Sequence, residues 1–123
     1  MNQRTMFLAI VLSACGGPNA EPPRPPETVG EWKLESAADA PRPAIPGVAQ
    51  SFHAVYAGPR RFEAEMHRMS GAGLSFEAVQ KWRPEAGRMA VHGGLWFVVV
   101  NREDASREDA MRFARALETA LKR

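Results

Sequence analysis

The feature that most restricts the fold of this 123-residue chain is an unbroken apolar run, Leu95–Val100, which directly follows Gly93-Gly94. Two glycines between apolar segments suit a two-residue turn with positive φ, so we predict a hairpin of residues 88–92 and 95–101. Successive side chains of a strand point to opposite faces, so the second strand is apolar on both. It is therefore either a central strand covered on both faces or a strand whose outer face meets a partner.

Three more strands are predicted from the alternation of apolar and polar residues. They cover residues 30–35, 51–57 and 60–69, and Gly58-Pro59 forms the turn between the last two. The side chains that we expect to face the core from these strands are Trp32, Leu34, Phe52, Ala54, Tyr56, Phe62, Ala64 and Met66.

The segment 36–50 is predicted to be a long loop, because three prolines and Gly47 interrupt it. A loop of this length is unusual in a compact domain, so we expect it to pack along the surface or to carry function. One alternative is that it covers the sheet face that the helices leave open.

Two segments have the period of amphipathic helices. The first, 70–83, is predicted to end before Pro84, since the residue before a proline avoids the α region. The second, 104–123, has the spacing of a capping box between Ser106 and Asp109. The apolar stripes consist of Leu74, Ala78, Val79 and Trp82 in the first helix and of Ala110, Phe113, Ala114, Leu117 and Leu121 in the second.

The order of these elements, β-β-β-α-β-β-α, predicts an α+β fold of two layers. One layer is an antiparallel sheet of about five strands, and the other is the pair of amphipathic helices on one face of that sheet. Residues 30–123 would form this single domain, and a chain of about 94 residues is long enough to bury one adequate core.

Charge and motifs exclude several function classes. The formal net charge is +2, from 16 Lys and Arg against 14 Asp and Glu, and no run of five like charges occurs. This argues against a nucleic-acid-binding arm. The sequence also lacks glycine-rich phosphate-binding motifs and the GxSxG nucleophile motif. We therefore predict no catalytic residue, no cofactor and no nucleic-acid partner.

Three histidines, His53, His67 and His92, are the candidate metal ligands. None has metal-ligand spacing to another, so only the fold could bring them together, and we expect no metal site. All three lie out of phase with the apolar face of their strands, where Glu63 and Glu65 would join them. Solvated or structural histidines are the default expectation. The alternative is a small metal-dependent or hydrolytic enzyme on this outer sheet face.

The apolar hairpin strand also gives a candidate partner surface. A two-layer fold leaves one sheet face without a helix, and Trp96 and Phe97 point to opposite faces, so one of them would lie there. If it is Trp96, then Val98 and Val100 lie beside it. An exposed apolar patch of this kind is typical of a surface that binds a partner or a ligand. If the loop 36–50 covers that face, no such patch exists.

The first residues carry a processing motif. A short polar start with Arg4 precedes the apolar run Met6–Leu12, which is too short to span a bilayer but has the length of a signal-peptide core. The four residues Leu12–Cys15 then resemble the lipobox of bacterial lipoproteins, which has a large aliphatic residue, two small residues and a cysteine. Cys15 is the single cysteine of the chain, so it has no disulfide partner within it.

This resemblance implies that residues 1–14 are a removed signal peptide and that Cys15 carries the lipid that anchors the protein in the bilayer. Gly16, rather than Asp, follows the cysteine, which by similarity to enterobacterial sorting favours the outer membrane over the inner membrane, with the domain in the periplasm. Residues 15–29 would be a tether, since their five prolines favour an extended conformation.

Together these features predict a location rather than an activity. We expect a lipid-anchored, non-enzymatic binding or assembly module of the cell envelope whose partner is an unidentified envelope protein or peptide. A small enzyme and a structural envelope factor are the alternatives. The hairpin 51–69, the helix 76–82 and the glycine hairpin also resemble small exported bacterial domains that have no known activity.

Overall fold

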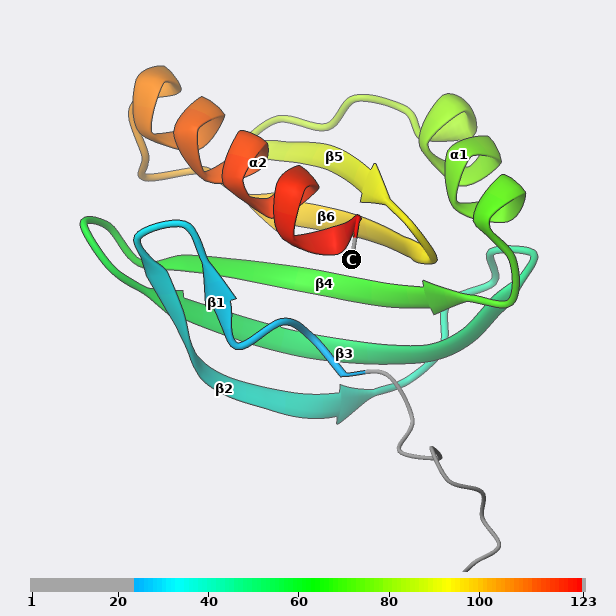
Figure 1. Cartoon of the computed structure of the whole chain (residues 1–123). Coiled ribbons are helices and arrows are strands. Elements are labelled where there is room, and N and C mark those ends of the chain that lie inside the picture. The colour runs from blue at the N-terminus through cyan, green and yellow to red at the C-terminus, as the bar shows by residue number, and fades with distance from the viewer. Residues whose placement is uncertain (1–23, 123) are drawn as a thin grey trace, which may run out of the picture.

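The structure is a computed structural model, and it describes residues 24–122 (Figure 1). These residues form an α+β fold with two helices and a six-stranded antiparallel sheet in the order β1-β2-β3-β4-β6-β5, which confirms the predicted class. The elements are β1 (Thr28–Val29), β2 (Trp32–Ala40), β3 (Val48–Ala57), β4 (Phe62–Met69), α1 (Ala72–Lys81), β5 (Arg88–Gly93), β6 (Trp96–Asn101) and α2 (Arg107–Leu121).

The predicted loop 36–50 is wrong at both ends. β2 continues to Ala40 and β3 begins at Val48, so the loop between them contains only residues 41–47. The added part of β2 consists of small residues without apolar alternation, and it is a strand because it pairs with β3. Such pairing is set by the neighbouring strand rather than by the local sequence.

The expected boundary between tether and domain lies too late in the chain. The Tyr56 hydroxyl donates a hydrogen bond of 2.7 Å to the carbonyl of Pro26, and the carbonyl of Glu27 accepts another from the backbone of β2. Val29, in the short strand β1, is fully buried. Residues 24–29 therefore belong to the domain. A proline has no N–H to donate, but its carbonyl can still accept a hydrogen bond, as that of Pro26 does.

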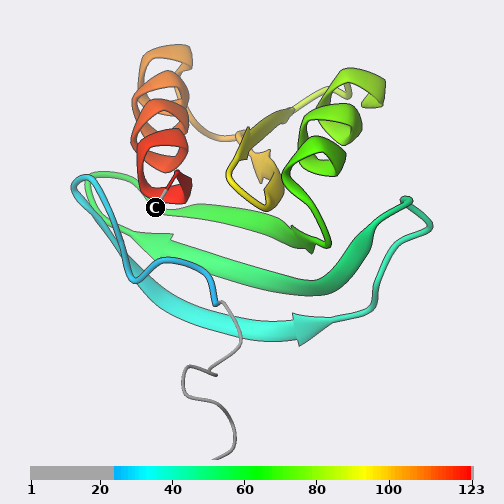
Figure 2. The same cartoon turned by 45° about the vertical axis from the view of Figure 1, so that its right-hand side comes forward.

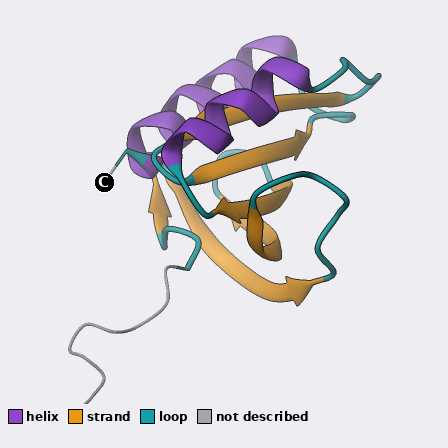
Figure 3. Cartoon of the chain, turned by 90° about the vertical axis from the view of Figure 1, so that its right-hand side faces the viewer, coloured by secondary structure: helices purple, strands orange, loops and turns teal. Residues whose placement is uncertain are grey.

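The prediction that both helices lie on one face of the sheet is also wrong. The sheet is curled, and the β5–β6 hairpin lies between the two helices (Figures 2 and 3). Alternate residues of β6 pack on different helices: Trp96 and Val98 join the α2 cluster, whereas Phe97 and Val99 join the α1 cluster. Each apolar face of β6 thus has its own helix, which corresponds to the first of the two alternatives for this strand, coverage on both faces.

The larger of the two cores lies under α2, on the concave side of the sheet. Phe113 of α2 stacks on Phe62 with ring centroids 4.5 Å apart and meets Trp32 edge-on at 5.1 Å.

At the start of α2 the Ser106 hydroxyl accepts a hydrogen bond of 3.1 Å from the backbone of Asp109, which confirms the predicted cap.

Candidate functional site

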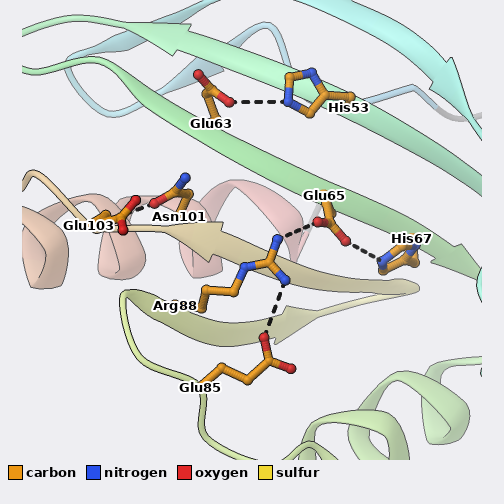
Figure 4. Close-up of polar contacts among 8 residues, drawn as sticks. All are labelled: His53, Glu63, Glu65, His67, Glu85, Arg88, Asn101 and Glu103. Carbon is orange, nitrogen blue, oxygen red and sulfur yellow. Dashed lines mark hydrogen bonds and ion pairs between the residues drawn. The ribbon is translucent and has the colours of Figure 1, made fainter.

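Five polar residues were expected on the outer sheet face, and four of them, His53, Glu63, Glu65 and His67, form two separate pairs there (Figure 4). His53 Nε2 lies 3.3 Å from Glu63 Oε1, and both side chains are about half exposed. His67 is only 4 % exposed, and its Nε2 lies 4.0 Å from Glu65 Oε1. The first pair is therefore a solvated contact, and the second belongs to the interior.

His67 is held between two strands. Its Nδ1 lies 2.7 Å from the hydroxyl oxygen of Ser51 on β3, and its ring stacks on Phe97 of β6. Burial lowers the pKa of His67 below its ordinary value, and the negative charge of Glu65 offsets part of that shift. The ring is thus neutral at pH 7 and acts as a hydrogen-bond partner of Ser51.

Arg88 ties the carboxylate of Glu65 to the loop before β5. Its Nη2 donates to Glu65 Oε2 at 2.5 Å, and its Nη1 donates to Glu85 Oε1 at 3.4 Å (Figure 4). β6 lies between β4 and β5, so this side chain crosses one strand to reach Glu65. The row from Ser51 to Glu85 therefore links β3, β4 and β5 on one face.

The two ends of this polar row differ in access, since Ser51 and His67 are buried whereas Glu65, Arg88 and Glu85 are partly exposed. Within residues 24–122, no three His, Cys, Asp or Glu side chains come close enough to hold a metal ion. His92 on β5 contacts Phe76, with ring centroids 5.5 Å apart. Ser51 beside His67 has the parts of an activated nucleophile, but Ser51 is 1 % exposed, so its hydroxyl is closed to a substrate in this structure.

The candidate partner surface of Trp96, Val98 and Val100 is not a surface. These side chains are 7 %, 0 % and 0 % exposed and belong to the core under α2. The prediction assumed that one sheet face is free of helices. It fails because α1 and α2 cover opposite faces of β6.

A cleft of about 350 Å³ opens between α1 and the loop 41–47, and we call it the α1 cleft. Trp82, directly after α1, lines it on one side, Ile45 of the loop lines it on the other, and Phe97 of β6 reaches it from the sheet. Ligand sites in proteins are typically apolar clefts of about 300–1,000 Å³. The apolar residues that line the cleft are Ala44, Ile45, Pro46, Leu74, Ala78, Trp82 and Phe97.

Two local features of the sequence build this cleft. Leu74 and Ala78 lie one helical turn apart, so they point to the same side of α1, as the helical period predicts. Gly47, at a φ of +90°, brings the loop against that side, because a Cβ there would lie 2.7 Å from Leu74 Cδ1. Sequence reasoning missed Ile45, whose one indication is that it is a large apolar residue within a proline-rich loop.

A larger hollow of about 450 Å³ lies beside the turn between β3 and β4, and its lining includes Arg60, Arg61 and Glu63. Two of these charges are already paired, since Arg61 lies 2.8 Å from Glu35 and Glu63 lies 3.3 Å from His53. With little apolar lining and its charges engaged, this hollow is a poorer ligand site than the α1 cleft.

Comparison with known proteins assigns no family to the chain, since no family model, no curated protein and no solved structure matches it. Neither helix of the described residues combines the length and the apolar character that crossing a bilayer requires. Cys15, with the predicted signal peptide 1–14, lies outside the described residues.

Proposed function

We propose that this protein is a lipid-anchored, non-enzymatic binding module of the bacterial envelope and that the α1 cleft is its ligand site. The observation that carries the proposal is the cleft itself, which has a volume of about 350 Å³ and is lined largely by apolar side chains from α1, β6 and the loop 41–47. The resemblance of Leu12–Cys15 to a lipobox supports the anchor, with Cys15 as the lipidated residue in the outer membrane.

The exposure of the cleft residues fits a site that is formed before its ligand arrives. Phe97, at the sheet, is 1 % exposed, whereas Ile45 and Trp82 remain partly exposed at the sides. A ligand between Ile45 and Trp82 would bury apolar surface that the fold leaves in water. Each Å² so buried contributes about 25 cal/mol to binding.

The position at which the domain begins limits how far it can lie from the proposed anchor at Cys15. Eight residues, 16–23, lie between Cys15 and Arg24, and the nine residue-to-residue steps from Cys15 to Arg24 span at most about 30 Å when fully extended. The expected tether of residues 15–29 would have reached farther. The proposed module therefore works close to the bilayer, and its ligand would be a component of the envelope.

The anchor is tested by metabolic labelling with an alkyne-bearing fatty acid, in cells that express the wild type or Cys15→Ala. We expect label on the wild type only, and a mature chain whose first residue is Cys15. Equal labelling of the two proteins, or a mature chain that retains Met1, would contradict the anchor. The result does not depend on what the α1 cleft binds.

The cleft is tested through the methyl group of Ile45. The chain has two isoleucines, Ile10 and Ile45. With Ile10→Val, the protein in neutral lipid nanodiscs has one labelled isoleucine δ1 methyl resonance whether or not residues 1–14 have been removed. We expect added 1-decanol to shift that resonance, because the rings of Trp82 and Phe97 line the same cleft.

The matched control is Ala44→Trp, which fills the cleft from an exposed position on its loop side. This variant should keep the unfolding temperature of the parent chain and lose the response to 1-decanol. An unchanged Ile45 resonance in the parent chain, or the same response in Ala44→Trp, would contradict the proposed site.

The two alternatives receive less support from the geometry. An enzyme on the outer sheet face would use His53, His67, Glu63 and Glu65, but His67 is buried and Glu65 is held by Arg88. A structural envelope factor needs no ligand site, so it is the interpretation that a failed 1-decanol titration would favour.

A further inference from the structure

Three charged side chains line the α1 cleft: Glu77, Lys81 and Arg83. Lys81 Nζ lies 3.9 Å from Glu77 Oε1, one turn away on the same helix, so these two charges largely cancel. In the part of the chain that the structure describes, no carboxylate oxygen lies within 4.0 Å of Arg83. The side chains that line the cleft therefore leave one cation unpaired.

The residues around the cleft leave part of the positive charge of Arg83 unbalanced. The loop 41–47 contains Arg42 and no acidic residue, so the wall opposite α1 adds no carboxylate. The C-terminal end of α1 contributes a partial negative charge, equivalent to about half an electron. Lys81 lies in that last turn but is already paired with Glu77, so about half a unit of positive charge remains at the opening. Across the opening, Arg83 meets no carboxylate of the loop 41–47.

The interior of the cleft differs in polarity from its charged opening. Its lining is apolar, and its volume of about 350 Å³ corresponds to about twelve non-hydrogen atoms, at about 30 Å³ for each water-sized group. A chain of about ten carbons with a small head group has this size. The charge at the opening would then lie next to the head group.

From this arrangement we infer that the α1 cleft selects a single-chain amphiphile with an anionic head group. The inference rests on the proposed binding function and names its ligand class. The alkyl chain would lie against Ile45, Trp82 and Phe97, and the anionic group would remain at the solvent-exposed opening beside Arg83. A cationic head group would instead meet the unpaired charge of Arg83.

Three ligands with the same ten-carbon chain separate the head-group preference from the apolar contribution: decanoate, 1-decanol and decyltrimethylammonium. Each is titrated, below the concentration at which it forms micelles, into the full chain carrying Ile10→Val in neutral nanodiscs. The Ile45 methyl shift reports binding. The affinity is referred to the free ligand concentration, because all three ligands also enter the lipid.

We expect decanoate to bind about fivefold more tightly than 1-decanol, as one exposed charge pair allows, and decyltrimethylammonium to bind most weakly. Arg83→Glu should reverse the order of the two charged ligands and leave 1-decanol unchanged. Arg83→Gln should make the three affinities similar. Arg83 is exposed, so both variants are expected to fold.

The control is Arg115→Glu, which makes the same charge change at an exposed position on α2, the helix that covers the opposite face of β6. It should keep the ligand order of the parent chain. Similar affinities for all three ligands in the parent chain, or an order that Arg83→Glu does not change, would overturn the anion preference and leave an apolar site. If none of the three ligands shifts Ile45, the proposed function itself fails.

Discussion

The imidazole of His67 lies against the ring of Phe97, with ring centroids 5.8 Å apart and planes inclined by 25°. Phe97 also lines the α1 cleft, so one aromatic side chain joins the buried end of the polar row on the outer sheet face to the proposed ligand site. We therefore expect substitutions of either residue to lower the free energy of unfolding.

Phe97→Ala should lower the free energy of unfolding by about 3–5 kcal/mol, because it removes a fully buried ring and leaves a cavity. Phe76→Ala is the matched control, since Phe76 is 50 % exposed and its loss should cost less than about 1 kcal/mol. Urea unfolding followed by tryptophan fluorescence measures both changes. Equal losses in the two variants would contradict the assignment of Phe97 to the core beneath α1.

Stability should decrease as the pH falls below the ordinary histidine pKa of about 6.5. Burial lowers the pKa of His67 in the folded chain, so the unfolded chain takes up the proton first and is favoured in that range. Above the unfolded pKa the ring is neutral in both states, and no stability is lost.

The unfolding temperature, measured between about pH 8 and about pH 5 across that ordinary pKa, tests this expectation. His67→Gln should show a smaller decrease over the same range than the parent chain, because it lacks the titrating ring. Parallel curves for the two proteins would show that another group causes the pH dependence.

Gly94→Ala should destabilise the fold by at least about 1 kcal/mol. Gly94 has a φ of +53°, and a Cβ there would lie 2.6 Å from the carbonyl oxygen of Leu121 at the end of α2. Gly73→Ala should instead stabilise by about 0.5–1 kcal/mol, since Gly73 is helical and has open space around it. Thermal unfolding of the two variants measures both effects, and a shift in the same direction would contradict this geometry.

The sequence predicted the parts of the fold that local rules determine. The stripe of α2 and its cap at Ser106 depend on residues a few positions apart, and both are present. The predicted hairpin also forms, but its two-residue turn is Gly94-Leu95 rather than Gly93-Gly94, because Gly93 pairs with Trp96 as the last residue of β5 and only Gly94 has a positive φ. Alternation also identified the hairpin strands β3 and β4, with Phe52 and Met66 in the core, although β3 begins at residue 48 rather than 51 and β4 at residue 62 rather than 60.

The remaining features depend on long-range packing. The last residues of β2 become a strand only through pairing with β3, and the curl of the sheet decides which face of β6 each helix covers. For the same reason the sequence placed Trp96 on a surface and left Ile45 in an open loop. The α1 cleft exists only where that loop meets the helix, so no motif in the sequence indicated it.

The most direct test of the proposed site is an intermolecular nuclear Overhauser effect between the Ile45 methyl group and the alkyl chain of bound decanoate, measured in the full chain with Ile10→Val in nanodiscs. The proposed site requires this contact in the parent chain and its loss in Ala44→Trp. If decanoate binds without a contact to Ile45, or if the contact persists in Ala44→Trp, the α1 cleft is not the ligand site.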